Sequence, residues 1–315
     1  MRQLPIPNSV FHYTTVEGLF HIIKDHQLRM TSADGVNDAQ EIIAGHEHVR
    51  RFLRCNQSRA GAQAALSIME MVDDPRTNTY IFCASGEEDD ASQWERYGAE
   101  GHGFAIEIGT TEADRLGVYS SEAVPLGKSD IFRFFHDTRA TIDQWTTALY
   151  TVGQRAEALE ARMSHWETQL EEAMKMKDIE LDDEGPDWDS YLNGLLEDCS
   201  TDFVSLANSM KHDGFRAENE FRVVATAERP LGEYAFYRPS QYGIVSSVYL
   251  VAQRDDESYG GMANIPPGST VPLLPIRRVI AGPRHSAAQV DRLRGFLDSK
   301  GYGDVRVDLS KVPIR

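Results

Sequence analysis

The sequence is poor in cysteine, in basic charge and in long apolar runs, and each shortage excludes a class of protein. Cys55, Cys83 and Cys199 are the only cysteines and form no CxxC pair, which favours reduced thiols in a cytoplasmic protein. Lys and Arg total 32 against 49 Asp and Glu, and the formal charge of −17 disfavours stable binding to nucleic acid or to an anionic membrane. No apolar run approaches the roughly 18–20 residues of a spanning helix, and the N-terminal stretch MRQLPIPNSVFHYTT has no apolar signal core.

Standard motifs for phosphate loops, hydrolases and metals are also missing. The chain contains no GxxxxGK[ST] and no GxSxG, and Gly101-His102-Gly103 lacks the third glycine of a dinucleotide fingerprint. His46 and His48 would diverge by about 200° on a helix, so they cannot share an ion. An EF-hand alignment on Gly185 places Tyr191 where a glutamate is needed, so the acidic stretch 177–189 is expected to be a solvated loop. We therefore expect no metal.

Strand patterns occur on both sides of a long helical stretch. Thr14 or Thr15 is expected to cap a first helix over 16–24, Asp38 to cap a second, and a C-terminal helix is expected over 287–300, ended by Gly301. The expected strands are 10–13, 28–31, 80–84, 104–108, 221–225, 245–251, 277–281 and 305–307.

The helical stretch carries two apolar stripes. Four-and-three steps in the first stripe form a heptad seam, made by Trp145, Leu149, Val152, Ala156, Leu159, Met163, Trp166, Leu170 and Ala173. The second stripe consists of Trp188, Leu192, Leu195, Cys199, Phe203, Leu206 and Met210. We expect an α+β core over 1–136 and 212–315, interrupted by a helical hairpin over 137–211. The stripes either pack on each other or bind a partner.

Polar and aromatic clusters lie at the ends of the expected strands. They are His12-Tyr13-Thr14-Thr15, Asn37-Asp38 with Glu41, Ser92-Gln93-Trp94-Glu95-Arg96-Tyr97-Gly98, and Glu218-Asn219-Glu220-Phe221-Arg222. Taken singly, each cluster is more typical of structural residues than of a site.

In this order, together with Ile280–Pro283 and Ser310–Arg315, the clusters resemble a bacterial family catalogued as domain-of-unknown-function family 2971. That family is in turn similar in layout to the ADP-ribosyltransferases, which bind NAD in the cleft of a split β-sheet core. The resemblance implies NAD as a substrate. His12 would bind the ribose, Tyr97 or Tyr13 would stack on nicotinamide, and Glu220 would engage the ribose 2′-hydroxyl.

The resemblance also assigns Glu218 to activation of the acceptor. The Ser-Thr-Ser signature of the transferases is absent, so Trp94 and Tyr97 are the expected substitutes, and Thr31-Ser32 is a stand-in. Thr14 and Ser32 complete the predicted cofactor-binding set.

The residue chemistry agrees with such a reaction. Glu218 and Glu220 on one strand would share a face about 7 Å apart, so that one carboxylate could stabilise an oxocarbenium-like sugar and the other could serve an incoming nucleophile. Arg222 would share that face, and Arg29 is a further phosphate-binding candidate.

Three functions remain open. The first is transfer of ADP-ribose to a macromolecular acceptor, protein or nucleic acid, by a bacterial toxin or anti-phage effector. The second is a non-catalytic sensor whose hairpin binds an antitoxin, another partner or a second copy of the chain. The third is a nuclease or hydrolase using Glu218, Glu220 and Asp38 with a divalent metal.

Overall fold

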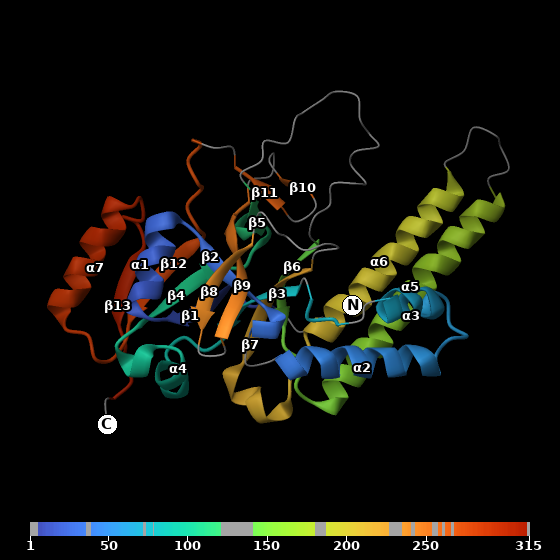
Figure 1. The fold of residues 1–315 in the computed structure, drawn as a ribbon, viewed down its shortest axis with the longest axis horizontal. Helices are drawn as coiled ribbons and strands as arrows, with labels where there is room; N and C mark the ends of the chain where they lie inside the picture. Colours follow the sequence, from blue (N-terminus) through green and yellow to red (C-terminus); the bar gives the residue numbers. More distant parts are fainter. Residues whose placement is uncertain are drawn as a thin grey trace. The chain divides into compact units, whose positions relative to one another are not determined.

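The computed structural model describes residues 6–35, 39–71, 74–77, 79–120, 141–179, 187–226, 235–240, 243–253, 258–259, 262–265 and 268–313 (Figure 1). They form a mixed α+β protein with a large, mostly antiparallel sheet and several helices. The chain groups into two compact units. Unit 1 comprises Met1–Pro5, Asn37–Thr77 and Ala148–Arg216, and unit 2 comprises Ile6–Val36, Asn78–Thr147 and Ala217–Arg315. No described helix is both long and apolar enough to cross a bilayer.

Unit 2 holds the sheet. Its 13 strands among the described residues are β1 (Ser9–Thr14), β2 (Leu28–Ser32), β3 (Thr79–Ser85), β4 (Phe104–Gly109), β5 (Leu116–Ser120), β6 (Thr141–Thr147), β7 (Glu220–Thr226), β8 (Phe236–Ser240), β9 (Gly243–Ala252), β10 (Ser258–Tyr259), β11 (Met262–Asn264), β12 (Ile276–Ala281) and β13 (Arg306–Leu309). The main path runs β10-β11-β5-β9-β2-β3-β1-β4-β12-β13, and β6, β7 and β8 pair alongside it. Only the pairs β5–β11 and β12–β13 are parallel among those described.

Helices of unit 2 lie on both faces of the sheet, because Trp94 packs with Phe11 and Ala105, whose side chains point away from the face of Val10 and Ile106. They are α1 (Val16–Asp25), α4 (Ala91–Arg96) and α7 (Ala287–Ser299), with short 3₁₀ helices η1 (Ala33–Gly35), η2 (Ala99–Gly101) and η3 (Glu112–Asp114). The apolar faces of α1 and α7 pack with inward strand residues in one core, which includes Leu19, Ile23, Leu293, Val10 and Ile106. Burial of these side chains is the main favourable term for the unit.

The ends of α1 and α7 follow the local sequence. Thr15 is the N-cap of α1, and its side chain accepts a hydrogen bond from the Gly18 N–H at 3.0 Å, which confirms the expected start. Ser286 and Gln289 form a capping box at the start of α7. Gly301 follows α7 with φ of +87°, the left-handed conformation that glycine adopts without strain, so the expected stop is also confirmed.

Strand β3 has one edge shared by two strands. Along its other edge β7 pairs with all of it, from Thr79 to Ser85. On the shared edge, β2 pairs with Tyr80 and Ile81, whereas β1 pairs with Ser85. Strands β1 and β2 therefore separate along residues 82–84 of β3, and this separation is called the fork.

Unit 1 is built from helices. They are α2 (Ala39–Cys55), α3 (Ala62–Met71), α5 (Val152–Ile179) and α6 (Trp188–Asn208), seen in blue and yellow-green in Figure 1. Much of the expected hairpin stripes packs with α2 and α3 around Leu159, Met163, Trp166, Phe203 and Leu53, whereas Val152 at the start of α5 is exposed. Helices α5 and α6 contact each other as expected, and the buried parts of the two stripes pack within the unit. The expected caps at Asp38 and the acidic residues 180–186 lie outside the described residues.

The boundaries differ from those expected in two places. Helices α2 and α3 group with the hairpin rather than with the core over 1–136, because the apolar faces of α2 and α3 pack against α6. Trp145, expected in the heptad seam, lies instead in β6, and its ring meets the Phe82 ring edge-on at 5.9 Å. The segment Thr-Ile-Asp-Gln-Trp-Thr-Thr is rich in β-branched residues, which favour a strand over a helix.

Candidate functional site

One residue of β3 at the fork is open to solvent. Cys83 is the one exposed residue of this strand, and it lies where β7 is paired with β3 but neither β1 nor β2 is. Alternation along β3 places Cys83 and Ser85 on one face and Phe82 and Ala84 on the other, core-facing side. The exposed face at Cys83 is called the outer face. Polar side chains of β2, β7, β8 and β9 gather on it.

His12 sits at the fork. Its Nδ1 lies 2.9 Å from the Cys83 carbonyl oxygen, and its ring lies against Phe82 with a centroid separation of 4.6 Å. Burial, aided by the charge of Arg29 and opposed by the Cys83 carbonyl, lowers the pKa of His12 to about 4. The ring is therefore neutral at pH 7. Because a carbonyl only accepts, Nδ1 carries the proton and Nε2 is left as an acceptor.

Tyr13 and Trp94 pack together beyond β1, and their polar atoms are already used. The Tyr13 hydroxyl donates to the Glu87 carbonyl at 2.8 Å and accepts from the Asp90 N–H, and Trp94 Nε1 donates to Asp89 at 2.6 Å. Burial raises the pKa of Tyr13. Both side chains are buried and their rings meet edge-on. This arrangement is that of a structural support rather than of a stacking platform for nicotinamide.

The remaining predicted residues of the first two strands are separated from one another. Thr14 ends β1 opposite Phe104. Ser32 is buried at the end of β2, and its hydroxyl has no hydrogen-bond partner within the described part of the chain. Arg29 is exposed on β2 and shares the outer face with Thr31, which pairs with Ile81.

Glu218 is held by two side chains that precede it by more than a hundred residues. Its Oε1 accepts from Arg96 Nη1 at 3.0 Å and from the Tyr97 hydroxyl at 2.9 Å. Its carbonyl accepts from Ser85 Oγ at 2.7 Å and from Gln93 Nε2 at 3.3 Å. Glu218 is therefore a buried carboxylate anchored to the α4 region.

The expected geometry of the two glutamates is wrong. Glu218 ends a 3₁₀ helix, η5 (Asp213–Glu218), and β7 begins only at Glu220. Asn219, between them, has a φ of +42°, which is left-handed rather than extended, so the backbone is kinked between the two glutamates. Two residues separated by such a kink do not follow strand alternation, and the 7 Å same-face spacing does not apply.

Glu220 and Arg222 form a buried ion pair on the outer face. Arg222 Nε donates to Glu220 Oε1, and Arg222 is fully buried. Glu220 pairs with Ser85 and Arg222 with Cys83 in the sheet register. The close guanidinium stabilises the ionised carboxylate, so Glu220 is a fixed negative charge beside the exposed Cys83 position.

The register separates His12 from Glu220. Glu220 lies on the face of Ser85, whereas the His12 ring contacts Phe82, which belongs to the opposite, core-facing side of β3. His12 nevertheless hydrogen-bonds to the backbone carbonyl of Cys83. Its ring therefore occupies the place at the edge of β3 where a neighbouring strand would otherwise pair. The two residues therefore flank β3 without touching.

Sequence reasoning missed Arg96, Gln93 and Arg238 as site residues. Arg96 and Gln93 belong to the cluster 92–98. The signal that could have identified them is their position next to Trp94 and Tyr97, the two residues of this cluster predicted to bind the cofactor. Arg238 reaches Thr31 across more than two hundred positions, a contact that local patterns cannot reveal.

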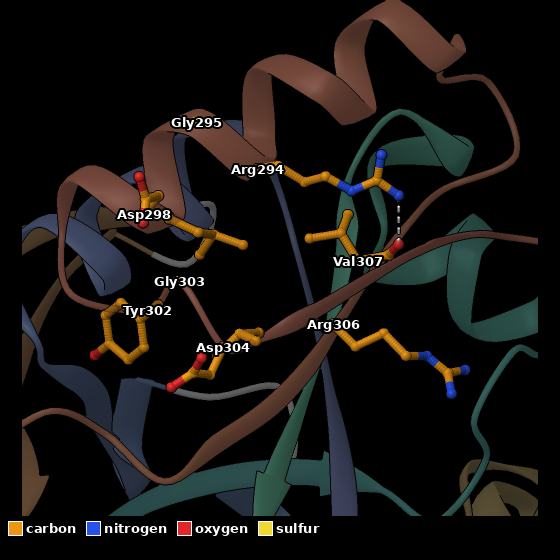
Figure 2. A pocket seen from close by; sticks show the side chains of 10 residues that line it. Arg294, Gly295, Asp298, Tyr302, Gly303, Asp304, Arg306 and Val307 are labelled. Atoms are coloured by element: carbon orange, nitrogen blue, oxygen red, sulfur yellow. Dashed lines mark hydrogen bonds between the residues drawn. The ribbon is translucent and has the colours of Figure 1, made fainter.

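Two cavities lie away from the fork. One is a groove of about 550 Å³ in unit 2, between α7 and residues 302–307 (Figure 2). Arg294 spans it by donating to the Val307 carbonyl at 3.2 Å, and the Tyr302 hydroxyl accepts from the Leu274 N–H. The Arg294 contact therefore ties α7 to β13.

The second cavity, of about 370 Å³, lies in unit 1. It is lined by Gln40, Glu41, Ala44, Gly45, Arg155, Met210, Lys211, His212 and Phe215. Arg155 donates to the carbonyls of Leu149, Tyr150 and Lys211, and the Lys211 ammonium lies 5.2 Å from the Phe215 ring centroid. These cations are engaged in holding the helix ends together.

The described part of the chain contains no cluster of three or more His, Cys, Asp or Glu side chains arranged to hold a metal ion. Comparison with known proteins adds no relative: no family model, no curated protein and no solved structure matches the chain.

Proposed function

We propose that the protein consumes NAD and transfers ADP-ribose to a macromolecular acceptor, with the reaction at the fork. The observation that carries the proposal is the neutral, half-buried His12 ring at the fork, whose Nε2 is a hydrogen-bond acceptor. A ribose hydroxyl is a donor that fits such a nitrogen. The split of β1 and β2 along β3 supports the resemblance to the ADP-ribosyltransferase layout.

The chemistry requires a fixed negative charge near the sugar. Cleavage of the bond to nicotinamide develops positive charge on the ribose, and an ionised carboxylate held in place stabilises that charge. Glu220 meets this requirement because Arg222 keeps it ionised and the outer face beside it is open at Cys83. Glu220 is the proposed catalytic residue, and His12 is the proposed ribose-binding residue.

Glu218 has a supporting role in this proposal. Its carboxylate already accepts from Arg96 and Tyr97, so the anchored Glu218 fixes the kink from which Glu220 starts β7. This differs from a second catalytic glutamate that activates the acceptor. The acceptor is a protein or a nucleic acid, and the biological setting is a toxin or an anti-phage effector.

A partner-binding role for the hairpin is the second candidate, and the observed packing disfavours it. Such a role needs an apolar seam left uncovered. Leu159, Met163, Trp166 and Leu170 are all buried inside unit 1 instead.

Release of nicotinamide tests the first proposal. The purified protein is incubated with NAD labelled in the nicotinamide ring and with cell extract, and free nicotinamide is measured. Glu220→Gln is expected to slow release about a hundredfold or more, because it removes the charge that stabilises the transition state. His12→Ala is expected to raise KM about tenfold with a smaller change in kcat.

Controls separate catalysis from folding. Glu112→Gln removes an exposed carboxylate of the same unit and is expected to leave the rate unchanged. Because Glu220→Gln removes a charge that the buried Arg222 contacts, Glu220→Asp is measured beside it, and thermal melting reports the folded fraction. Absence of nicotinamide release from folded wild-type protein, or an unchanged rate in folded Glu220→Gln, would sink the proposal.

A further inference from the structure

Two arginines lie together on the outer face near the fork. Arg29 on β2 pairs with Tyr249 of β9 in the sheet register, and Arg238 comes from β8 on the other edge of β9. Burial of Arg238 lowers the pKa of its guanidinium, and the nearby positive charge of Arg29 lowers it further. Within the described residues, no carboxylate pairs with either guanidinium. Two guanidinium groups near each other repel, and an anion bound between them would relieve that repulsion.

Hydrogen bonds hold Arg238 in a defined position. Its Nη2 donates to Thr31 Oγ1 at 2.8 Å, and its Nε donates to Ser247 Oγ at 3.1 Å. Ser247 is fully buried and pairs with Thr31 across the β2–β9 ladder. The neutral hydroxyls position the guanidinium without neutralising it, so its positive charge stays available for an anion.

An aromatic pair borders the arginines. Phe236 of β8 and Tyr249 of β9 stack with centroids 4.4 Å apart and planes inclined by 21°. Both rings are half-buried, and the register places Tyr249 opposite Arg29 and Phe236 opposite Ser247. Cations beside an aromatic surface suit a ligand that joins phosphates to a planar ring.

We propose that Arg29 and Arg238 bind the phosphate groups of a nucleotide whose base lies on the Phe236–Tyr249 pair. The fork residues His12 and Glu220 are not part of this site. The proposal requires binding alone, so it holds whether or not the protein consumes NAD. Two sources carry this ligand chemistry: a free nucleotide and single-stranded nucleic acid.

Calorimetric titration of the full chain tests the phosphate contacts. Inorganic pyrophosphate is expected to bind the wild-type protein, and Arg29→Gln and Arg238→Gln are each expected to weaken binding about tenfold, because each loses a charge-assisted contact. Arg292→Gln, on the exposed side of α7, removes the same charge from the same unit and is expected to bind as wild type. Arg238→Lys keeps the positive charge. Pyrophosphate binding retained in this variant shows that the loss of binding in Arg238→Gln comes from the missing charge and not from misfolding.

Adenosine diphosphate tests the aromatic contact. It is expected to bind more tightly than pyrophosphate, and Tyr249→Leu is expected to abolish that advantage while leaving pyrophosphate affinity unchanged. Tighter binding of a short oligoadenylate than of adenosine diphosphate assigns the site to single-stranded nucleic acid, and the reverse order assigns it to a free nucleotide. No pyrophosphate binding by folded protein, or equal affinities in Arg29→Gln and Arg292→Gln, overturns the proposal. Binding without nicotinamide release would overturn the proposed function alone.

Discussion

At the scale of single residues, the backbone at Asn219 decides what the two glutamates can do. Its left-handed conformation separates Glu218, anchored by Arg96 and Tyr97, from Glu220, paired with Arg222. A Glu-x-Glu motif in a strand would have placed both carboxylates on one face. Here one carboxylate stabilises the local chain, and the other is held by Arg222 on the outer face of the sheet.

The left-handed conformation of Asn219 can be tested by the stability of variants at this position. Asn219→Ala is expected to lower the free energy of unfolding by about 1 kcal/mol or more, since alanine is strained at positive φ. Asn219→Gly should lose less, because glycine adopts the same φ freely, although both variants lose the bond from Asn219 Nδ2 to Glu87. Urea unfolding measures the difference. Equal stability of the two variants would contradict the argument.

At the scale of elements, local patterns predicted more of the fold than of the site. The Thr15 cap, the strand over 80–84 and the stop at Gly301 depend on short-range chemistry and were confirmed. The kink at Asn219 and the contact from Arg238 to Thr31 depend on the tertiary structure. The heptad pattern includes Trp145 although α5 begins only at Val152, and this tryptophan lies in β6. The prediction was wrong because apolar residues spaced by three or four positions can continue beyond the end of a helix. The candidate site was therefore predicted in its residue types but not in its geometry.

The link between α2 and α6 gives a pH dependence. His46 Nε2 lies 3.0 Å from Asn208 Oδ1, and buried Nδ1 has no partner among the described residues. Burial lowers the pKa of His46 to about 4 from an unfolded value of 6.5. Above pH 6.5 the histidine is neutral in both states. As pH falls from 6.5 to 4, only the unfolded state gains the proton, so stability decreases, by about 3 kcal/mol in total.

His46→Gln should remove this share of the acid loss, since the amide keeps a donor for Asn208 and does not titrate. His165→Gln on the exposed side of α5 is the matched control and should follow the wild-type curve. Urea unfolding at a series of pH values supplies the measurement. His12 contributes a further loss of the same sign over the same window. Identical pH profiles of wild type and His46→Gln would rule this origin out.

At the scale of the whole molecule, each unit has its own hydrophobic core. The core of unit 2 gathers around β1, β3 and β4, and that of unit 1 gathers around α2, α3, α5 and α6. Contacts within a unit are expected to fail together, because burial of one apolar side chain depends on its neighbours.

Phe203→Ala should therefore act on unit 1. The side chain is fully buried in α6, and its removal is expected to cost about 3–5 kcal/mol. Native-state hydrogen exchange should show faster exchange in the amides of the four helices of unit 1, with those of β1, β3 and β4 little changed. Ser164→Ala on the exposed face of α5 is a control expected to change neither set. Equal loss of protection in β1, β3 and β4 would show that the cores unfold as one.

The pairing of β2 with β9 sets the order of events during synthesis. Leu28 pairs with Leu250. Strand β2 must therefore wait until Leu250 has left the ribosome before the edge that pairs with β9 is covered. Contacts of such long sequence separation predict slow folding. During that wait, the apolar residues of α1 and the unpaired edge of β2 are open to aggregation, and a chaperone that shields them would raise the yield of folded protein.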